Sequence, residues 1–271
     1  MIFLHGLGSF SGEILSAFTT QPPAGRYIAV DRPGYGFSDP LPAAASGPDA
    51  QAGWLERVLD AMEIRTAVIV AHSIGAATAL HFASQRPERV AGLLLLAPYG
   101  RPTRPAFVPL LRAAMLPLIG GPLRRLIRAA PSRFARAKLA TVFYPNAVPA
   151  RFRRFPFRHV TRSRALLAIG YELRGYNQAM MRLSLRLRQI QAPTVILAGN
   201  KDRIAQSERH AFWLASRLPK ADLILLPRVG HMPHHAAPKV ADRALRRLIG
   251  TTGITCGITC GSKQGLGGFR P

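Results

Sequence analysis

Four short segments carry residue types used in nucleophilic catalysis, and the first holds a serine. Ala71-His72-Ser73-Ile74-Gly75 follows an apolar run that ends at Val70. A serine on a tight strand-to-helix turn projects from the carboxyl edge of a sheet, and small neighbours let the helix pack close to the strand. Ser73 is therefore a candidate nucleophile, and the Ile74 backbone N–H is a candidate oxyanion donor. The alternative is a serine that merely caps the helix.

The second segment is His5-Gly6-Leu7-Gly8, directly after the first apolar run. Its glycines let the backbone turn so that a peptide N–H, best that of Leu7, faces an oxyanion. An ordinary strand-to-loop turn has the same composition. Its position agrees with that of the Ser73 segment, and this favours the catalytic interpretation.

An acid and a histidine follow two later apolar runs. They lie in Gly199-Asn200-Lys201-Asp202-Arg203 and Val229-Gly230-His231-Met232-Pro233. The chain order Ser73, Asp202, His231 is one in which serine triads occur. In such a triad His231 takes the serine proton and delivers it to the leaving group, while Asp202 orients the imidazole. A lone Asp after a strand is usually a helix cap, but all four segments are expected at one sheet edge, which favours catalysis.

The elements that must position these residues follow from the hydrophobic pattern. Continuous apolar runs are typical of parallel strands buried on both faces, and helical spacing lies between them at 50–62, 75–85 and 206–218. Strands that alternate with helices predict a doubly wound α/β fold with a mostly parallel sheet. The six expected strands are Ile2–Leu4, Tyr27–Val30, Ala67–Val70, Gly92–Leu96, Thr194–Leu197 and Leu223–Leu226.

Composition excludes several classes of protein. The 271 residues are 48% hydrophobic and 18% charged, which argues against a disordered chain, and the net charge is +24. No signal peptide or spanning segment is visible. The two cysteines, Cys256 and Cys260, make neither a disulfide framework nor a four-thiolate site, and they fit the reducing cytosol. We expect a cytoplasmic protein, and the sequence carries no signal for an oligomeric state.

At this point residues 1–249 resemble the α/β-hydrolase superfamily, in particular its small bacterial serine-hydrolase branch. Asp31-Arg32-Pro33-Gly34-Tyr35-Gly36-Phe37-Ser38 looks like the family's Asp-x-x-Gly-x-Gly-x-Ser loop. The resemblance implies triad roles for Ser73, Asp202 and His231, and oxyanion roles for Leu7 and Ile74. His5, Gly6, Gly8, His72 and Gly75 would complete the supporting motifs.

The resemblance also implies a domain plan. Residues 1–100 and 189–249 would form the core, and residues 101–188 a helical, Arg-rich cap over the pocket. Residues 250–271, which repeat Gly-Ile-Thr-Cys and end in a Gly-rich stretch, predict a disordered tail.

The sequence departs from the family pattern in three places. The first glycine of the serine turn is Ala71, a change of one methyl group that we expect the turn to tolerate. The chain begins on what resembles the family's third strand, so we expect a late start site or a truncated reading frame. The strand Tyr27–Val30 would then have an exposed apolar edge, an aggregation liability. The repetitive tail has no counterpart in the family, and a frame error is one expected origin for it.

No cofactor or metal is expected. Ser73 excludes the related dehalogenases and epoxide hydrolases, which use an Asp at this position, and acyl transfer by a serine triad needs no metal. His234 and His235 follow His231, but this spacing without carboxylate or cysteine partners is a weak metal signal. A zinc role for the Cys-x3-Cys of Cys256 and Cys260 is equally weak. No GxGxxG pattern follows a strand.

The segment 101–188 is strongly basic. It holds 19 basic residues and one acid, Glu172, a net charge of +18. Arginines interleave with apolar residues, as in interfacial elements on anionic membranes. Nucleic acid is a competing partner, but no nucleic-acid module is present. An Arg-rich proteome with solvated faces explains the charge equally well, because only five basic residues are lysines. The last part, Met181–Arg188, fits strand and helix periods equally.

The sequence therefore predicts a serine hydrolase that works through an acyl-enzyme on a carboxylic ester with an apolar acyl group. One alternative is a non-catalytic binding protein in peripheral contact with the inner membrane face. Another is a carbon–carbon bond hydrolase or a cofactor-free haloperoxidase, which resemble the same scaffold and triad. The choice of an ester as substrate comes mostly from the resemblance in fold, and one fold hosts many activities.

Overall fold

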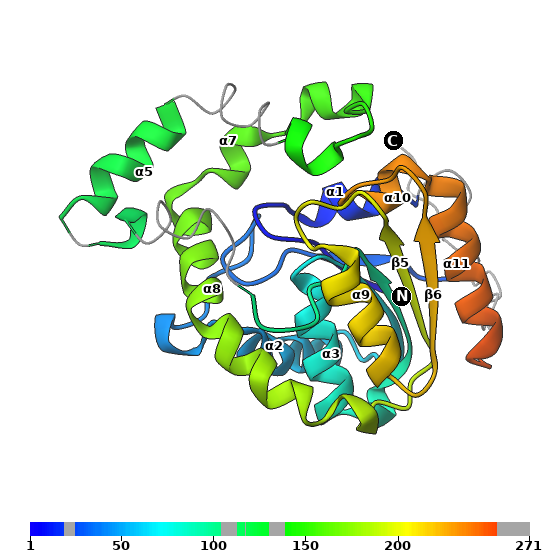
Figure 1. Ribbon diagram of the computed structural model, residues 1–271. Coiled ribbons are helices and arrows are strands. Elements are labelled where there is room, and N and C mark those ends of the chain that lie inside the picture. The colour runs from blue at the N-terminus through cyan, green and yellow to red at the C-terminus, as the bar shows by residue number, and fades with distance from the viewer. Residues whose placement is uncertain (19–24, 104–112, 117, 130–138, 254–271) are drawn as a thin grey trace, which may run out of the picture.

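The computed structural model describes residues 1–18, 25–103, 113–116, 118–129 and 139–253. Within these residues the centre of the molecule is a parallel sheet in the order β2-β1-β3-β4-β5-β6 (Figure 1). The predicted α/β fold with a mostly parallel sheet is confirmed. The strands are β1 (Ile2–Leu4), β2 (Ile28–Val30), β3 (Ala67–His72), β4 (Val90–Leu96), β5 (Thr194–Gly199) and β6 (Ala221–Leu226).

The continuous apolar runs arise because alternate strand residues enter two different cores. On β3, Ile69 and Ala71 pack in the core on one face, while Val68 and Val70 pack in the core on the other face. The strand β2 is half-buried because it lies at the edge of the sheet, and its side chains also divide between the two cores.

Helices cover both faces of the sheet. α2, α3, α8 and α9 contribute to one core, and α1 and α11 contribute to the other (Figure 1). α2 follows the expected pattern, since Pro48 opens the helix and Leu55 and Leu59 are buried four residues apart. The helices of the core are α1 (Ser11–Leu15), α2 (Pro48–Ala61), α3 (Gly75–Gln85), α9 (Ser207–Arg217), α10 (Pro233–Ala236) and α11 (Pro238–Thr251), with short 3-10 turns η1 (Ala43–Ala45) and η2 (Pro87–Arg89).

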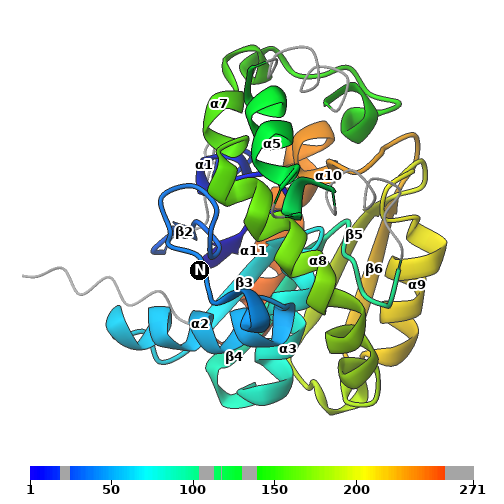
Figure 2. The same cartoon turned by 90° about the vertical axis from the view of Figure 1, so that its left-hand side faces the viewer.

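The segment between β4 and β5 is largely helical where it is described. It contains α5 (Gly120–Ala129), η3 (Ala150–Arg154), α7 (Phe157–Val160), α8 (Ser163–Ser184) and η4 (Leu187–Gln189). α8 packs against α2, α3 and α5, and α5 and α7 lie on the side of the sheet toward which the strands point (Figures 1 and 2).

Three details extend the expectations from the sequence. Met181–Arg188 is the end of α8 followed by η4, so it contains no strand. α11 reaches Thr251, past the expected end of the core at residue 249, and residues 254–271, with Cys256 and Cys260, lie outside the described residues. Among the described helices, none combines the length and the apolar character that crossing a membrane requires.

Candidate functional site

Ser73 occupies a strained turn between β3 and α3. Its φ is +55°, in the left-handed region that non-glycine residues rarely adopt, and its N–H donates to the Leu96 carbonyl at 2.9 Å. Gly75 is required beside it, because a Cβ there would lie 2.7 Å from the His5 carbonyl oxygen. Ala71 sits within β3, in register with Leu4 on β1, so the extra methyl falls on regular strand. The turn is thus held in place by the neighbouring strands.

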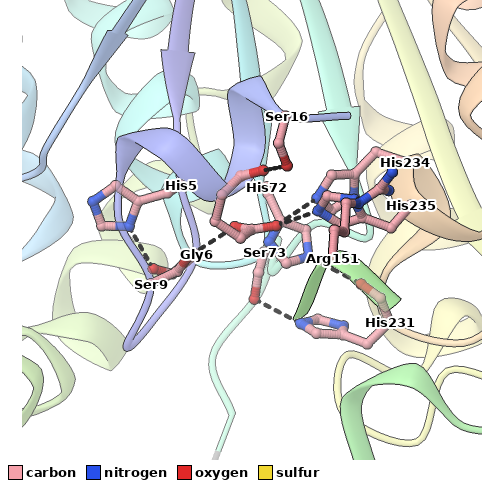
Figure 3. A network of polar contacts seen from close by, with 11 residues as sticks. His5, Gly6, Ser9, Ser16, His72, Ser73, Arg151, His231, His234 and His235 are labelled. Carbon is pink, nitrogen blue, oxygen red and sulfur yellow. Dashed lines mark hydrogen bonds and ion pairs between the residues drawn. The ribbon is translucent and has the colours of Figure 1, made fainter. Parts of the chain in front are cut away.

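The structure brings Ser73, His231 and Asp202 into one hydrogen-bonded chain (Figure 3 shows the Ser73–His231 contact). His231 Nε2 lies 2.9 Å from Ser73 Oγ, and His231 Nδ1 lies 2.8 Å from Asp202 Oδ2. All three side chains are buried at the carboxyl ends of β3, β5 and β6. Through these contacts the Ser73 hydroxyl can pass its proton to the His231 imidazole, while the Asp202 carboxylate holds the ring in place.

The Asp202 carboxylate is held ionised by its surroundings. Burial raises its pKa, but the charge and hydrogen bond of His231 and the backbone N–H groups of Ile204 and Ala205 together lower the pKa below its ordinary value. Ile204 and Ala205 donate to Oδ1 at 2.8 and 2.9 Å, which leaves Oδ2 for His231. An oriented anion at this position favours the imidazolium that forms when Ser73 loses its proton.

The His5-Gly6-Leu7-Gly8 turn lies directly against the serine. A Cβ on Gly6 would lie 2.8 Å from His72 Nδ1 and 3.2 Å from Ser73 Cβ, and Gly8 has a φ of +63°. Within the described residues, the backbone N–H groups of Leu7 and Ile74 donate to no other backbone carbonyl. The oxyanion roles of Leu7 and Ile74 remain predictions, and both N–H groups are free of backbone partners.

His5 anchors this turn through both ring nitrogens. Nδ1–H donates to the Gly6 carbonyl at 2.8 Å, and Nε2 accepts the Arg32 backbone N–H at 3.0 Å. Burial, reinforced by the Arg32 charge, lowers the pKa of His5 to about 3, so the ring is neutral at physiological pH. His5 therefore stabilises the turn through two hydrogen bonds to backbone groups, as a neutral ring.

A buried ion pair behind the turn was not anticipated from the sequence. The Arg32 guanidinium donates to the His5 carbonyl at 2.8 Å and to the carboxylate of Glu172 on α8, and Tyr35 also donates to Glu172 at 2.7 Å. The pair links the turn to the basic segment. Its signal in the sequence is that Glu172 is the single acid in a segment of net charge +18.

The loop Asp31–Ser38 ties the turn to α1. Asp31 accepts the backbone N–H of Ser11 at 2.7 Å and of Phe37 at 2.9 Å. Gly36 has a φ of +49° and packs against the Asp31 carboxylate, so a side chain there would displace it. The glycine in this motif is therefore a spatial requirement.

A second group of histidines lies near His231 (Figure 3). His234 and His235, on α10, converge on the buried Glu13 of α1, and their ligand-type atoms lie within 4.8 Å of one another. The expectation that these histidines lack a carboxylate partner is wrong. Glu13 is more than 200 residues away along the chain, so nothing local to either segment reveals the contact.

Comparison with known proteins identifies the family. A model of the Alpha/beta hydrolase family matches residues 1–243. The chain is 29% identical to a 2-hydroxy-6-oxononadienedioate/2-hydroxy-6-oxononatrienedioate hydrolase of Pseudomonas putida, covering 88% of this chain and 84% of that protein. It is 26% identical to a pimeloyl-[acyl-carrier protein] methyl ester esterase of Nitrosospira multiformis, covering 88% and 89%. A solved esterase from Thermogutta terrifontis superposes with a TM-score of 0.71 at 21% identity, covering 93% and 89%. The protein therefore belongs to the Alpha/beta hydrolase family and is an enzyme.

Proposed function

We propose that this protein is a serine hydrolase in which Ser73 is the nucleophile, His231 the general base and acid, and Asp202 the orienting carboxylate. The observation that carries the proposal is the chain of contacts from Asp202 Oδ2 to His231 Nδ1 at 2.8 Å and from His231 Nε2 to Ser73 Oγ at 2.9 Å. Distances in this range allow proton transfer without rearrangement.

The geometry supports a two-step reaction. Ser73 Oγ attacks the substrate carbonyl carbon while its proton passes to His231 Nε2, and the oxyanion is held by the N–H groups of Leu7 and Ile74. The imidazolium then protonates the leaving alcohol, which departs and leaves an ester on Ser73. A water molecule, deprotonated by His231, attacks this acyl-enzyme, and the acid leaves with the serine hydroxyl restored. The chemistry needs no cofactor or metal.

We further propose that residues 101–188 act as a cap that selects the substrate, an ester with an apolar acyl group. The position of α5 and α7 on the side toward which the strands point supports this role (Figure 2). Apolar side chains of α8, Leu166 and Ile169, pack with Leu7 beside the oxyanion turn. Ser73 is only 4% exposed, so substrate entry requires covering side chains to move.

Hydrolysis of p-nitrophenyl esters of increasing acyl length tests the proposal. We expect turnover that favours medium or long chains, and a loss of at least about 10³-fold for Ser73→Ala and for His231→Ala, because a triad acts as a unit. A folded protein that hydrolyses none of the esters, or a Ser73→Ala variant with unchanged turnover, would overturn it.

A carbon–carbon bond hydrolase is the second candidate, supported by the Pseudomonas putida relative and by a 28% identical 2-hydroxy-6-oxo-6-phenylhexa-2,4-dienoate hydrolase of Burkholderia cepacia. The same triad would serve, so the two candidates differ in substrate. Turnover of a 6-oxo-dienoate at least tenfold above that of every simple ester would favour this candidate, and the reverse would favour the esterase.

A surface formed by α5 and the turn before it supports a further proposal, peripheral binding to an anionic membrane. Ile127 packs with the core cluster of α8, while Leu118 in the turn, at 90% exposed, and Leu126 on α5 are exposed together with Arg125 and Arg128. Apolar side chains beside arginines complement a bilayer with negative headgroups, at about 1 kcal/mol for each basic residue.

Flotation with vesicles that contain phosphatidylglycerol tests this surface. Binding should fall with added salt and with the double variant Leu118→Ser/Arg125→Gln. The matched control is Leu185→Ser, which removes a leucine that is 84% exposed just after α8. Equal binding by the wild type and the α5 variant would overturn the membrane proposal.

A further inference from the structure

A buried polar cluster lies next to the Ser73–His231 pair and has no part in the proposed proton transfers (Figure 3). It joins three parts of the chain: α1 with the turn before it, the end of β3, and α10, with one arginine from η3. We refer to it as the Glu13 cluster, and its members are Ser9, Glu13, His72, Arg151, His234 and His235.

Glu13 is the anion at the centre of the cluster. Its Oε1 accepts from His235 Nε2 at 2.7 Å and from His234 Nε2 at 3.1 Å, and its Oε2 accepts from Ser9 Oγ at 2.7 Å. Burial raises the pKa of Glu13, but the hydrogen bonds and electrostatic interactions of His234 and His235 together hold the pKa well below its ordinary value. The carboxylate is therefore charged and can only accept hydrogen bonds.

The contacts determine which histidine nitrogens carry protons. Arg151 Nη2, which can only donate, lies 2.6 Å from His235 Nδ1, so the His235 proton is on Nε2 and points at Glu13. His234 also presents Nε2 to the carboxylate, which requires a proton there. His72 Nε2 lies 2.9 Å from the His231 carbonyl, which again requires a proton on Nε2. All three rings are in the same tautomer.

This tautomer pattern argues against a metal ion between Glu13, His234 and His235. A metal would need a lone pair on each Nε2, which moves the His235 proton to Nδ1. That proton would then face the Arg151 donor at 2.6 Å. The arginine contact is compatible only with a hydrogen-bonded cluster, in which the carboxylate takes both imidazole protons.

The cluster fixes His231 from two sides. His72, the residue before Ser73, holds the His231 backbone carbonyl, and Glu13 holds His234 and His235, three and four residues further along. The His72 ring packs on the His234 ring at 4.5 Å, so the two attachments are in contact. A displacement of α10 would therefore move the His231 imidazole relative to Ser73 Oγ.

We infer that Glu13 is a positioning residue: it orients His234 and His235, and through α10 and His72 it keeps His231 Nε2 in hydrogen-bonding distance of Ser73 Oγ. The inference rests on the proposed function. Its basis is a buried carboxylate with three donors, two of which belong to α10, the helix that begins two residues after His231.

Arg151 extends this positioning to the basic segment. Arg151 contacts His235, and the next residue, Phe152, packs with Phe143 and Met232 in a small core. The Phe152 and His235 rings lie 4.9 Å apart. The η3 turn thus rests on the residues that follow His231. Arg154 lies three residues along the same turn and offers a matched arginine for comparison.

Steady-state kinetics of Glu13→Leu test the inference. Leucine keeps most of the volume but removes the oxygen on which the two imidazole donors converge, so we expect kcat about 10- to 100-fold lower with KM within about twofold, the effect of misplacing a catalytic group by a fraction of an ångström. Arg151→Met should lower kcat more than Arg154→Met. Leu59→Ala, a buried core truncation distant from the cluster, controls for lost stability and should leave kcat within about twofold below its melting temperature.

Imidazole ¹⁵N NMR gives a second readout that needs neither activity nor a variant. The wild type should show Nε2–H tautomers at His72, His234 and His235, unchanged by added Zn²⁺. Nδ1–H tautomers at His234 and His235, or a Glu13→Leu variant with wild-type kcat, would overturn the inference. A wild type with the expected tautomers but no turnover, in which Glu13→Leu shifts the His231 resonances, would overturn the proposed function and leave the positioning of His231 standing.

Discussion

His72 donates a hydrogen bond from Nε2 to the backbone carbonyl of His231 at 2.9 Å, across 159 residues of chain. The residue before the proposed nucleophile therefore holds the backbone of the proposed base, and the two rings lie 5.0 Å apart. This hydrogen bond joins the turn that carries Ser73 to the loop that carries His231. The Ser73–His231 distance therefore depends on the His72 side chain, which takes no part in the proposed chemistry.

Replacing His72 tests this coupling. His72→Phe fills the space but removes the donor, and we expect kcat/KM about tenfold lower, equivalent to the roughly 1.4 kcal/mol that a lost buried hydrogen bond costs. His72→Gln can offer an N–H at a similar reach and should recover most of the loss. Ester kinetics of both variants check this, and equal rates for Phe and Gln would contradict the coupling.

Acid should destabilise the protein well before its carboxylates titrate. Burial lowers the pKa of His5 to about 3, and burial lowers the pKa values of His210 and His234 to about 4, against about 6.5 for each in the unfolded chain. Between pH 6.5 and 4 the unfolded chain binds more protons than the folded protein, so stability falls as pH falls. Each such group contributes up to about 1.4 kcal/mol per pH unit.

Urea unfolding at pH 8, 7, 6 and 5 measures this slope. The midpoint should be nearly constant from pH 8 to 7 and should fall steadily below 6.5. The low pKa values of Glu13 and Asp202 add a further loss only below about pH 4.5, because their stabilising charge is present above their unfolded pKa values. A midpoint that is constant down to pH 5 would show that the buried histidines titrate normally.

Two glycines with opposite surroundings test the packing of the serine turn. A Cβ at Gly75 would lie 2.7 and 2.9 Å from the carbonyl oxygens of His5 and Leu4, so Gly75→Ala should cost about 2 kcal/mol or more of unfolding free energy. Gly250 lies in α11 with nothing within 4 Å of its added Cβ, so Gly250→Ala should stabilise by about 0.5–1 kcal/mol. Thermal unfolding of the two variants should move in opposite directions.

The buried pair Arg32–Glu172 should matter far more than an exposed pair. Arg32→Met leaves the Glu172 carboxylate buried with Tyr35 as its remaining partner, and we expect a loss of about 3–5 kcal/mol. Arg247→Gln breaks an exposed pair with Asp222 and should cost less than about 1 kcal/mol. Denaturant titrations compare them, and similar losses would show that burial does not govern the Arg32 pair.

Much of the fold was predictable because parallel strands buried on both faces leave continuous apolar runs. β1 agrees with its expected bounds, and β3 and β5 extend by two residues into the turns that carry Ser73 and Asp202. The contact of Ser73, Asp202 and His231 followed from one geometric fact, that the carboxyl ends of parallel strands meet at one edge. The helix Pro238–Thr251 was not foreseen, although its buried residues Ala241, Ala244, Leu245 and Leu248 have the spacing of one helix face.

The supporting contacts were not predictable, because they join segments with no common local pattern. Glu13 meets His235 across 222 residues, and Arg32 meets Glu172 across 140. Burial of a charged side chain depends on every element around it, and that environment exists only after the sheet and α8 have assembled. The sequence marked Glu172 only as an isolated acid, and marked His234 and His235 only as neighbours of His231.

Mass spectrometry of the protein after brief exposure to an activated fluorophosphonate tests whether Ser73 is a nucleophile activated by His231. We predict a single adduct on the peptide that contains Ser73, no adduct with Ser73→Ala, and labelling slowed by at least about 10³-fold with His231→Ala. A folded wild-type protein that stays unlabelled, or labelling that is equally fast without the His231 imidazole, would contradict it.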